Sequence, residues 1–224
     1  MKPYETFYQK GFELFKFNSL VLDEVLKDML EGRIKEGFTL QQKYLKTLDL
    51  RPNVIEYSPV FLDVLRENKI KTLIRSRTLR DPTLHHIQVR ITNCSDESYM
   101  DWHRDTYFDG DKKIGMTPPG LKIIYYPVFN NVIEPRLVLS EGTHRTMLDR
   151  RSDDLSIVNK FPNKIISSSK DHALLFDTSV LHAVVPDKIN HPSIRVIYSF
   201  IAKEQIEDAV ELHKITSKLY EDLI

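Results

Sequence analysis

The sequence predicts a β-rich α+β fold, and three observations lead to it. Helical periodicity dominates residues 1–83, short β-like segments separated by turn residues fill 84–202, and a helical pattern returns over 203–224. Strands at this spacing are typical of a sandwich or barrel, not of alternating βαβ units. We therefore expect the 224 residues to form one domain, 1–224, in which N-terminal helical support (1–83) and a C-terminal helix flank a β-rich core.

Two helices are predicted in the N-terminal part of the chain. Over 19–31, apolar residues recur every three or four positions between acids and lysines, and Ser19 is placed to cap the helix. A second helix is predicted over 58–68, where Pro59 suits the first turn. The stretch 38–49 between them is ambiguous, and the same apolar spacing predicts the closing helix over 204–223.

The β-rich core is predicted from short apolar runs bounded by turn residues. These runs are 85–91, 121–129, 137–139, 172–177, 181–185 and 194–202. The first run alternates, with Ile87 and Val89 on one face and Gln88 and Arg90 on the other, so its polar face can line a site. The segments 106–119 and 146–162 interrupt the strands, and we expect them to be loops that border the site.

Composition favours a small partner and a reducing compartment. Thirty-two basic residues balance thirty-two acidic ones, so the chain has no net charge with which to gather nucleic acid or an anionic membrane. Cys94 is the only cysteine, which excludes an intrachain disulfide and a zinc site built from thiolates. Since the first residues do not resemble a secretory signal and no run is long enough to span a membrane, we expect a cytoplasmic protein.

A candidate metal site emerges from residues far apart in the sequence. In an extended segment, residues two positions apart project from one face, so His103 and Asp105 reach a common point. His182 lies 79 residues further on, at the predicted start of a strand. Two histidines and a carboxylate form the facial triad of non-haem Fe(II) oxygenases. Arg195 and Ser199 share a face of the last strand, and a guanidinium with a hydroxyl can bind a buried carboxylate.

With these residues in this order, the sequence resembles the Fe(II)/2-oxoglutarate-dependent dioxygenases, and within them the phytanoyl-CoA dioxygenase-like branch. The run 120–126 (GLKIIYY) is similar to the third core strand of that branch, 137–145 (LVLSEGTHR) to its Pro-Gly-Ser-His segment, and 173–177 (ALLFD) to its approach to the distal histidine. The resemblance covers 84–202. It departs at Ser140 and Glu141, where a proline is usual, and at Arg104, where a glutamine is frequent.

The resemblance implies a double-stranded β-helix, which is a jelly-roll or cupin-like core. It implies Fe(II) held by His103, Asp105 and His182 as the catalytic centre. The implied reaction hydroxylates a C–H bond of a small-molecule substrate while 2-oxoglutarate and O₂ are converted to succinate and CO₂. Relatives that halogenate carry a small residue in place of the carboxylate, so the presence of Asp105 favours hydroxylation.

The resemblance also implies that 2-oxoglutarate is the cosubstrate and that its distal carboxylate pairs with Arg195 and Ser199. Gln88, Arg90, Lys122 and Tyr126 can all face the pocket, and Gln88 and Tyr126 among them are further candidates for cosubstrate binding. The identity of the primary substrate and the oligomeric state do not follow from these residues.

Two other classes of function remain open. A nucleic-acid demethylase of the AlkB type shares the triad, but that family places a second arginine six residues after the first, where this chain has Ile201. A non-catalytic cupin-like binding module would keep the fold without turnover.

The remaining candidate residues are expected to be structural. His144 is expected to orient a neighbour by hydrogen bonding, Trp102 to pack in the core, and Cys94 to be inert. Four further histidines are expected at the surface or satisfied within the core; they are His85, His172, His191 and His213.

Overall fold

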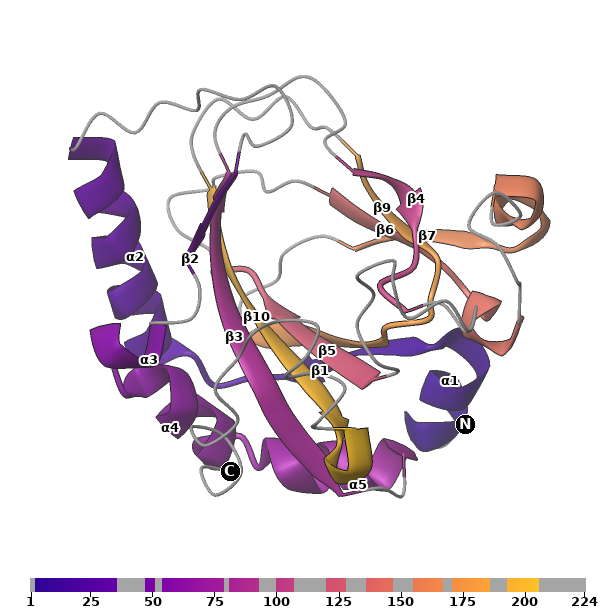
Figure 1. The fold of residues 1–224 in the computed structure, drawn as a ribbon, viewed down its shortest axis with the longest axis horizontal. Coiled ribbons are helices and arrows are strands. Elements are labelled where there is room, and N and C mark those ends of the chain that lie inside the picture. The colour runs from indigo at the N-terminus through magenta and orange to yellow at the C-terminus, as the bar shows by residue number, and fades with distance from the viewer. Residues whose placement is uncertain are drawn as a thin grey trace.

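Two facing antiparallel sheets with helices on one outer side make up the fold (Figure 1). The structure is a computed structural model, and it describes residues 3–35, 47–50, 54–78, 81–92, 100–106, 120–127, 136–146, 155–166, 171–185 and 193–205. The predicted C-terminal helix therefore lies outside the described residues, apart from the short 3₁₀-helix η4 (Lys203–Gln205).

The larger sheet has six strands. Their order is β1 (Phe12–Lys16), β8 (His172–Asp177), β5 (Gly120–Tyr125), β10 (Ser193–Ala202), β3 (Pro82–Thr92) and β2 (Thr47–Leu50). The smaller sheet has four strands in the order β4 (Met100–His103), β9 (His182–Val185), β6 (Arg136–Ser140) and β7 (Asn163–Ile166). Along the chain, β3 to β10 alternate between the sheets except at the β6–β7 hairpin. This is the double-stranded β-helix that was expected.

Alternating side chains of the larger sheet build two separate apolar layers. On β10, Val196 and Tyr198 face the helices, whereas Ile197 faces the smaller sheet and packs with Leu137 and Val184. Burial of each such side chain stabilises the fold by about 1.5–3 kcal/mol. The second layer fixes the spacing between the sheets, and the polar site lies between them.

Helices cover the outer face of the larger sheet. They are α2 (Leu20–Lys35), α3 (Val54–Tyr57), α4 (Val60–Glu67) and α5 (Ile70–Thr78). The helix α1 (Pro3–Lys10) lies beside the turn that follows β6, where the backbone N–H of Gly142 donates to the carbonyl of Lys10 at 2.9 Å. In Figure 1, α2 and α4 lie on the side of the larger sheet that faces away from β4, β6, β7 and β9. Their apolar side chains join the layer that includes Val196 and Tyr198. None of the described helices is long and apolar enough to cross a membrane.

The predicted helices 19–31 and 58–68 are confirmed as α2 and α4. Ser19 precedes α2 as expected, but its hydroxyl contacts the hydroxyl of Tyr125 at 2.6 Å and a carboxylate oxygen of Asp23 at 3.2 Å. The start of α2 is thereby tied to the larger sheet.

Several elements were not predicted. The region 1–83 was expected to be helical support, yet it also contributes β1 and β2 as the two edge strands of the larger sheet. The helices α1 and α5, the strand β7, and the short 3₁₀-helices η2 (Thr143–Arg145) and η3 (Val158–Lys160) were also missed. In β7 three of four residues are exposed, so backbone pairing with β6 defines this strand and no side-chain pattern marks it.

Candidate metal centre

Two of the candidate ligands are neighbours in the smaller sheet. His103 is the last residue of β4 and His182 the first of β9, and the two residues are partners in the strand register. Their imidazole centroids lie 4.3 Å apart. The fold therefore brings together the two histidines that the sequence separates by 79 residues.

Asp105 reaches the same point by a route that differs from the expected one. It was expected two positions along a strand from His103, but β4 ends at His103 and Asp105 lies in a bend beyond it. The backbone N–H of Asp105 donates to the carbonyl of Thr178 at 2.9 Å, and that of Thr106 to the same carbonyl at 3.2 Å. The position of Asp105 is thus set by the turn before His182, not by strand alternation.

Thr178 holds both ends of the segment that leaves Asp105 and returns to β5. Its hydroxyl accepts from the hydroxyl of Thr106 at 2.7 Å and from the backbone N–H of Gly120 at 2.9 Å. Its backbone N–H donates to the carbonyl of Gly120 at 3.0 Å. Thr178 is buried, so these bonds form away from solvent.

The three side chains point their ligand atoms at one another. The ligand atoms all lie within 4.8 Å of one another, with Asp105 Oδ1 4.0 Å from His103 Nε2 and Asp105 Oδ2 3.6 Å from His182 Nε2. Each imidazole places Nδ1 against a backbone carbonyl two residues earlier, at 2.7 Å for His103 and 2.9 Å for His182. A hydrogen bond from Nδ1 assigns the tautomer whose Nε2 lone pair is available to a metal.

The charges around the site favour an ionised carboxylate and a neutral imidazole. Burial alone would raise the pKa of Asp105, but the positive charge of Lys122 opposes this and holds that pKa below its usual range. Lys122 Nζ lies 2.8 Å from Asp105 Oδ2. Burial lowers the pKa of His182 to about 4. Both side chains are therefore in the protonation state that a divalent metal requires.

A cavity of roughly 50 Å³ lies beside these ligand atoms, between the two sheets. Gln88, Tyr126 and Arg195, which were expected to bind a cosubstrate, all line it. Ser199 is buried on the same strand as Arg195 but is not among the lining residues, and it stands opposite Lys122 in the register of β10 and β5.

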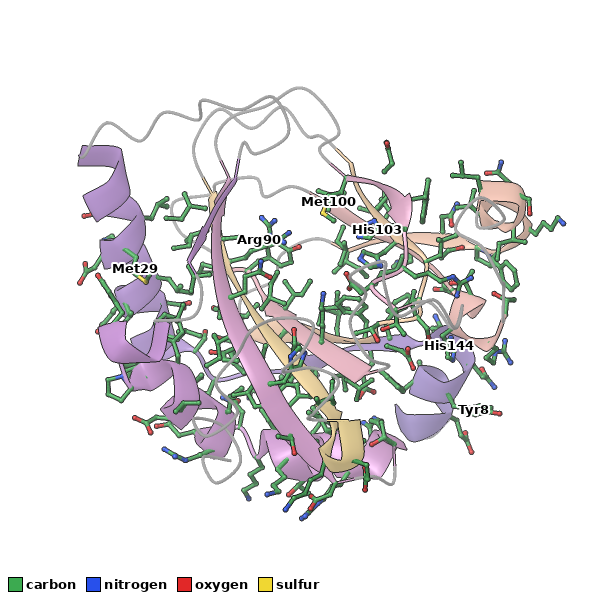
Figure 2. The ribbon with its side chains drawn as sticks, in the orientation of Figure 1. Tyr8, Met29, Arg90, Met100, His103 and His144 are labelled. Carbon is green, nitrogen blue, oxygen red and sulfur yellow. The ribbon has the colours of Figure 1, made fainter. Side chains whose placement is uncertain are left out.

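Arg90 also lines the cavity, and Figure 2 shows it pointing toward Met100 in the space between the sheets. Its guanidinium lies 3.9 Å from the sulfur of Met100. Alternation within β3 places Arg90 and Gln88 on the inner face, as predicted from the sequence.

Sequence reasoning missed the role of Arg104, which lies between two of the ligands. Its buried guanidinium donates to the carbonyls of Thr143 and Ser179 and, at 3.0 Å, to the hydroxyl of Thr146. These bonds connect the ligand-bearing segment to two turns of the fold. Sequence could have suggested this role only through the position of an arginine inside a buried motif.

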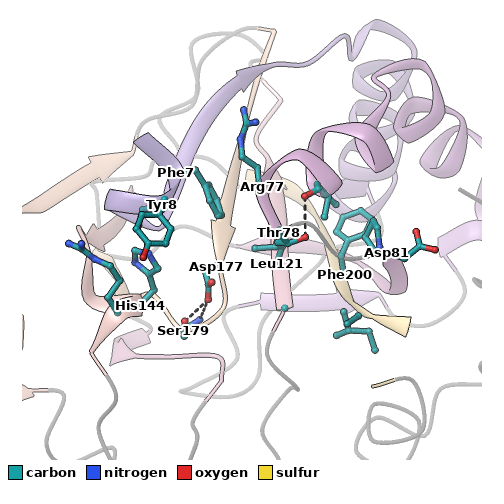
Figure 3. A pocket seen from close by; sticks show the side chains of 16 residues that line it. Phe7, Tyr8, Arg77, Thr78, Asp81, Leu121, His144, Asp177, Ser179 and Phe200 are labelled. Atoms are coloured by element: carbon teal, nitrogen blue, oxygen red, sulfur yellow. Dashed lines mark hydrogen bonds between the residues drawn. The ribbon is translucent and has the colours of Figure 1, made fainter. Parts of the chain in front are cut away.

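His144, which was expected to orient a neighbour by hydrogen bonding, lies away from the metal centre. It lines a second cavity of about 380 Å³, which shares no lining residue with the first (Figure 3). Its Nε2 is 2.9 Å from the carbonyl of Tyr8, and burial lowers the pKa of its imidazole. Gly11 packs against it so closely that an added Cβ would lie 2.5 Å from His144 Nδ1.

The other residues that were expected to be structural fall into two groups. Trp102 packs on an apolar cluster with Leu181, which confirms a core role, while His85 is buried and His172 is exposed. Cys94, His191 and His213 lie outside the described residues.

Comparison with solved structures identifies the fold. The non-haem alpha ketoglutarate dependent carbocyclase SnoK from nogalamycin biosynthesis is similar with a TM-score of 0.66 and 8% identity, covering 90% of this chain and 84% of its own. EctD from S. alaskensis with 2-oxoglutarate and 5-hydroxyectoine gives 0.65 and 13%, covering 91% and 77%. The epimerase SnoN, also alpha ketoglutarate dependent, gives 0.63 and 11%, covering 89% and 81%.

No protein-family model and no curated protein matches the sequence. At these identities the structural likeness establishes a shared architecture. The chain therefore has the fold of non-haem iron and 2-oxoglutarate-dependent enzymes.

Proposed function

We propose that the protein is an Fe(II)- and 2-oxoglutarate-dependent dioxygenase that hydroxylates a C–H bond of a small molecule. The observation that carries the proposal is the convergence of two imidazole Nε2 atoms and one carboxylate within 4.8 Å, beside a cavity lined by an arginine. Among the similar solved structures, EctD binds Fe in one and 2-oxoglutarate with 5-hydroxyectoine in another, and SnoN is in complex with Fe³⁺, alpha ketoglutarate and nogalamycin RO.

The donor set suits Fe(II). Two neutral imidazoles and one carboxylate are the ligand types that ferrous iron takes in non-haem oxygenases, where the remaining coordination positions stay open. His103, Asp105 and His182 would hold the metal. When bound with 2-oxoglutarate, iron supplies O₂ activation, which ordinary side chains cannot perform.

Arg195 is the residue that we assign to the distal carboxylate of 2-oxoglutarate. Its guanidinium is buried and lies on the inner face of β10, where it can form two parallel hydrogen bonds to a carboxylate. Ser199 is four residues away, about 13 Å along an extended strand, on the side of Lys122. That separation favours Arg195 as the main contact of this carboxylate, together with Gln88 on the neighbouring strand β3 and Tyr126 just beyond the end of β5.

Anaerobic titration tests the proposal. Adding Fe(II) and then 2-oxoglutarate to the protein under nitrogen should produce a weak visible metal-to-ligand charge-transfer band. We expect the band to require both additions. If no band forms although both bind, or if neither binds, the protein is a cupin-like binding module and the proposal is wrong.

The reaction outcome needs a second measurement, because SnoN and SnoK are described as an epimerase and a carbocyclase. Small metabolites are screened for coupled consumption of 2-oxoglutarate under labelled O₂. A hydroxylase transfers one labelled oxygen atom to the product, whereas epimerisation or ring closure does not. Assignment to the phytanoyl-CoA dioxygenase-like branch and a cytoplasmic location stay predictions.

Nucleic-acid demethylation is the less favoured alternative. Position 201, where a demethylase of the AlkB type carries a second arginine, is a buried isoleucine at the end of β10. The chain also has no net charge to attract a polyanion. Methylated single-stranded DNA in the same coupled assay checks this alternative.

A further inference from the structure

We propose that Lys122 is a positioning residue that restricts Asp105 to binding the metal through a single oxygen. The inference rests on the proposed metal site and extends it to a residue that the facial triad does not include. Its physical basis is the contact between the lysine ammonium and one of the two carboxylate oxygens.

The carboxylate of Asp105 faces the gap between the imidazoles with both oxygens. Oδ1 lies 4.0 Å from His103 Nε2, and Oδ2 lies 3.6 Å from His182 Nε2. A metal bound by both nitrogens would therefore meet both oxygens of the carboxylate. Without a further constraint, this orientation permits bidentate binding, which carboxylates adopt readily with divalent metals.

Lys122 supplies the constraint. Its Nζ lies 2.8 Å from Oδ2, within range of a charge-assisted hydrogen bond, and its side chain is only 14% exposed. The residue belongs to β5, between Phe176 of β8 and Ser199 of β10 in the register of the larger sheet. The ammonium therefore forms a short ion pair with Oδ2, and we assign Oδ1 as the oxygen that binds the metal.

The number of oxygen atoms that Asp105 contributes determines how many coordination positions of the metal remain open. Two imidazoles and one carboxylate oxygen leave three positions of an octahedral metal open, enough for a bidentate 2-oxo acid and O₂. Two carboxylate oxygens would leave two, and the 2-oxo acid would fill both. A lysine at this position therefore preserves the vacant position that oxygen needs.

The test uses Co(II) in place of iron, since its visible d–d bands report coordination number without turnover. The full-length protein and its Lys122→Met variant are titrated with Co(II) in the absence of 2-oxoglutarate. We expect the variant to bind Co(II) at least as tightly as the parent and to show a changed d–d spectrum. Lys122→Arg, which keeps a cationic donor, should restore the parent spectrum.

Control substitutions isolate the contact from the loss of charge. Lys164→Met removes an exposed lysine of β7 and should leave the spectrum unchanged. If Lys122→Met does not fold, Lys122→Ala with added ethylamine replaces it, and the amine should return the spectrum to that of the parent.

A second readout is the affinity for 2-oxoglutarate, measured anaerobically with Fe(II). We expect Lys122→Met to weaken it about tenfold, the scale at which partners of ligating residues act. Loss of the positive charge of Lys122 would by itself weaken binding of the 2-oxoglutarate dianion. The Co(II) spectrum recorded without 2-oxoglutarate is therefore the measurement that tests the coordination of Asp105. An unchanged spectrum in Lys122→Met overturns the inference even if 2-oxoglutarate binds less tightly.

Failure of this inference is distinguishable from failure of the proposed function. If the parent protein binds neither Co(II) nor Fe(II), the metal site itself is wrong. If the parent binds metal and forms the charge-transfer band but Lys122→Met has the same Co(II) spectrum, only the role of Lys122 is wrong.

Discussion

Replacement of Arg104 by leucine should destabilise the fold and loosen the metal site together. Arg104 donates to two buried backbone carbonyls, those of Thr143 and Ser179. At about 1.5 kcal/mol for each charge-assisted hydrogen bond, the substitution should lower the free energy of unfolding by roughly 3 kcal/mol. For a chain of this length that corresponds to a fall in Tm of roughly 6–12 °C.

Urea unfolding followed by circular dichroism measures the effect, with Arg66→Leu as the matched control. Arg66 pairs with Asp63 on α4, but both side chains are about half exposed, so its loss should cost about 0–1 kcal/mol. A free energy for Arg104→Leu within 1 kcal/mol of the control value would refute the role of Arg104 as a buried tether. Metal affinity, measured on the folded variant, should also fall because Arg104 adjoins both His103 and Asp105.

Three further predictions concern the metal, the cosubstrate and the core. His182→Ala should abolish metal binding, measured by calorimetry, with little change in Tm; turnover of 2-oxoglutarate at the parent rate would contradict the site. Arg195→Ala should chiefly raise the KM for 2-oxoglutarate, and an unchanged KM would place the carboxylate elsewhere. Tyr125→Phe removes two hydrogen bonds of 2.6 Å and should lower the free energy of unfolding by about 2 kcal/mol. Tyr198→Phe is the control and should be neutral or stabilising, because the buried hydroxyl of Tyr198 has no hydrogen-bond partner among the described residues. Equal urea midpoints for Tyr125→Phe and Tyr198→Phe would contradict the stabilising role of the Tyr125 hydroxyl.

The sequence predicted most strands of the β core because they have a strong side-chain signal, which the missed strand β7 lacks. Strand β8 (His172–Asp177) contains a continuous apolar run, and β3 alternates between apolar and polar residues. In both strands the apolar positions in the sequence are the positions that pack in the folded protein. Edge elements carry a weaker signal. In α5 only Ile70 and Ile74 are fully buried, and this helix forms because it packs against the sheet.

The triad was predictable because residue type and order are enough to propose it. The contacts that hold Asp105 in position were not predictable from the sequence. Asp105 is placed by a backbone carbonyl 73 residues away, and Lys122 reaches it from a different sheet. Such contacts are tertiary: a lysine on a strand has no local feature that indicates a partner across the fold.

Thr178 joins two segments of the chain that lie far from it in the sequence. Thr106 and Gly120, the described residues on either side of 107–119, both form hydrogen bonds to this one buried threonine, and Thr106 directly follows Asp105. Insertions, deletions or new sequences within those residues can therefore arise without displacing the ligand. We expect Asp105 to keep its place as long as Thr178 is present, and substitution of Thr178 to release Thr106 and Gly120 together.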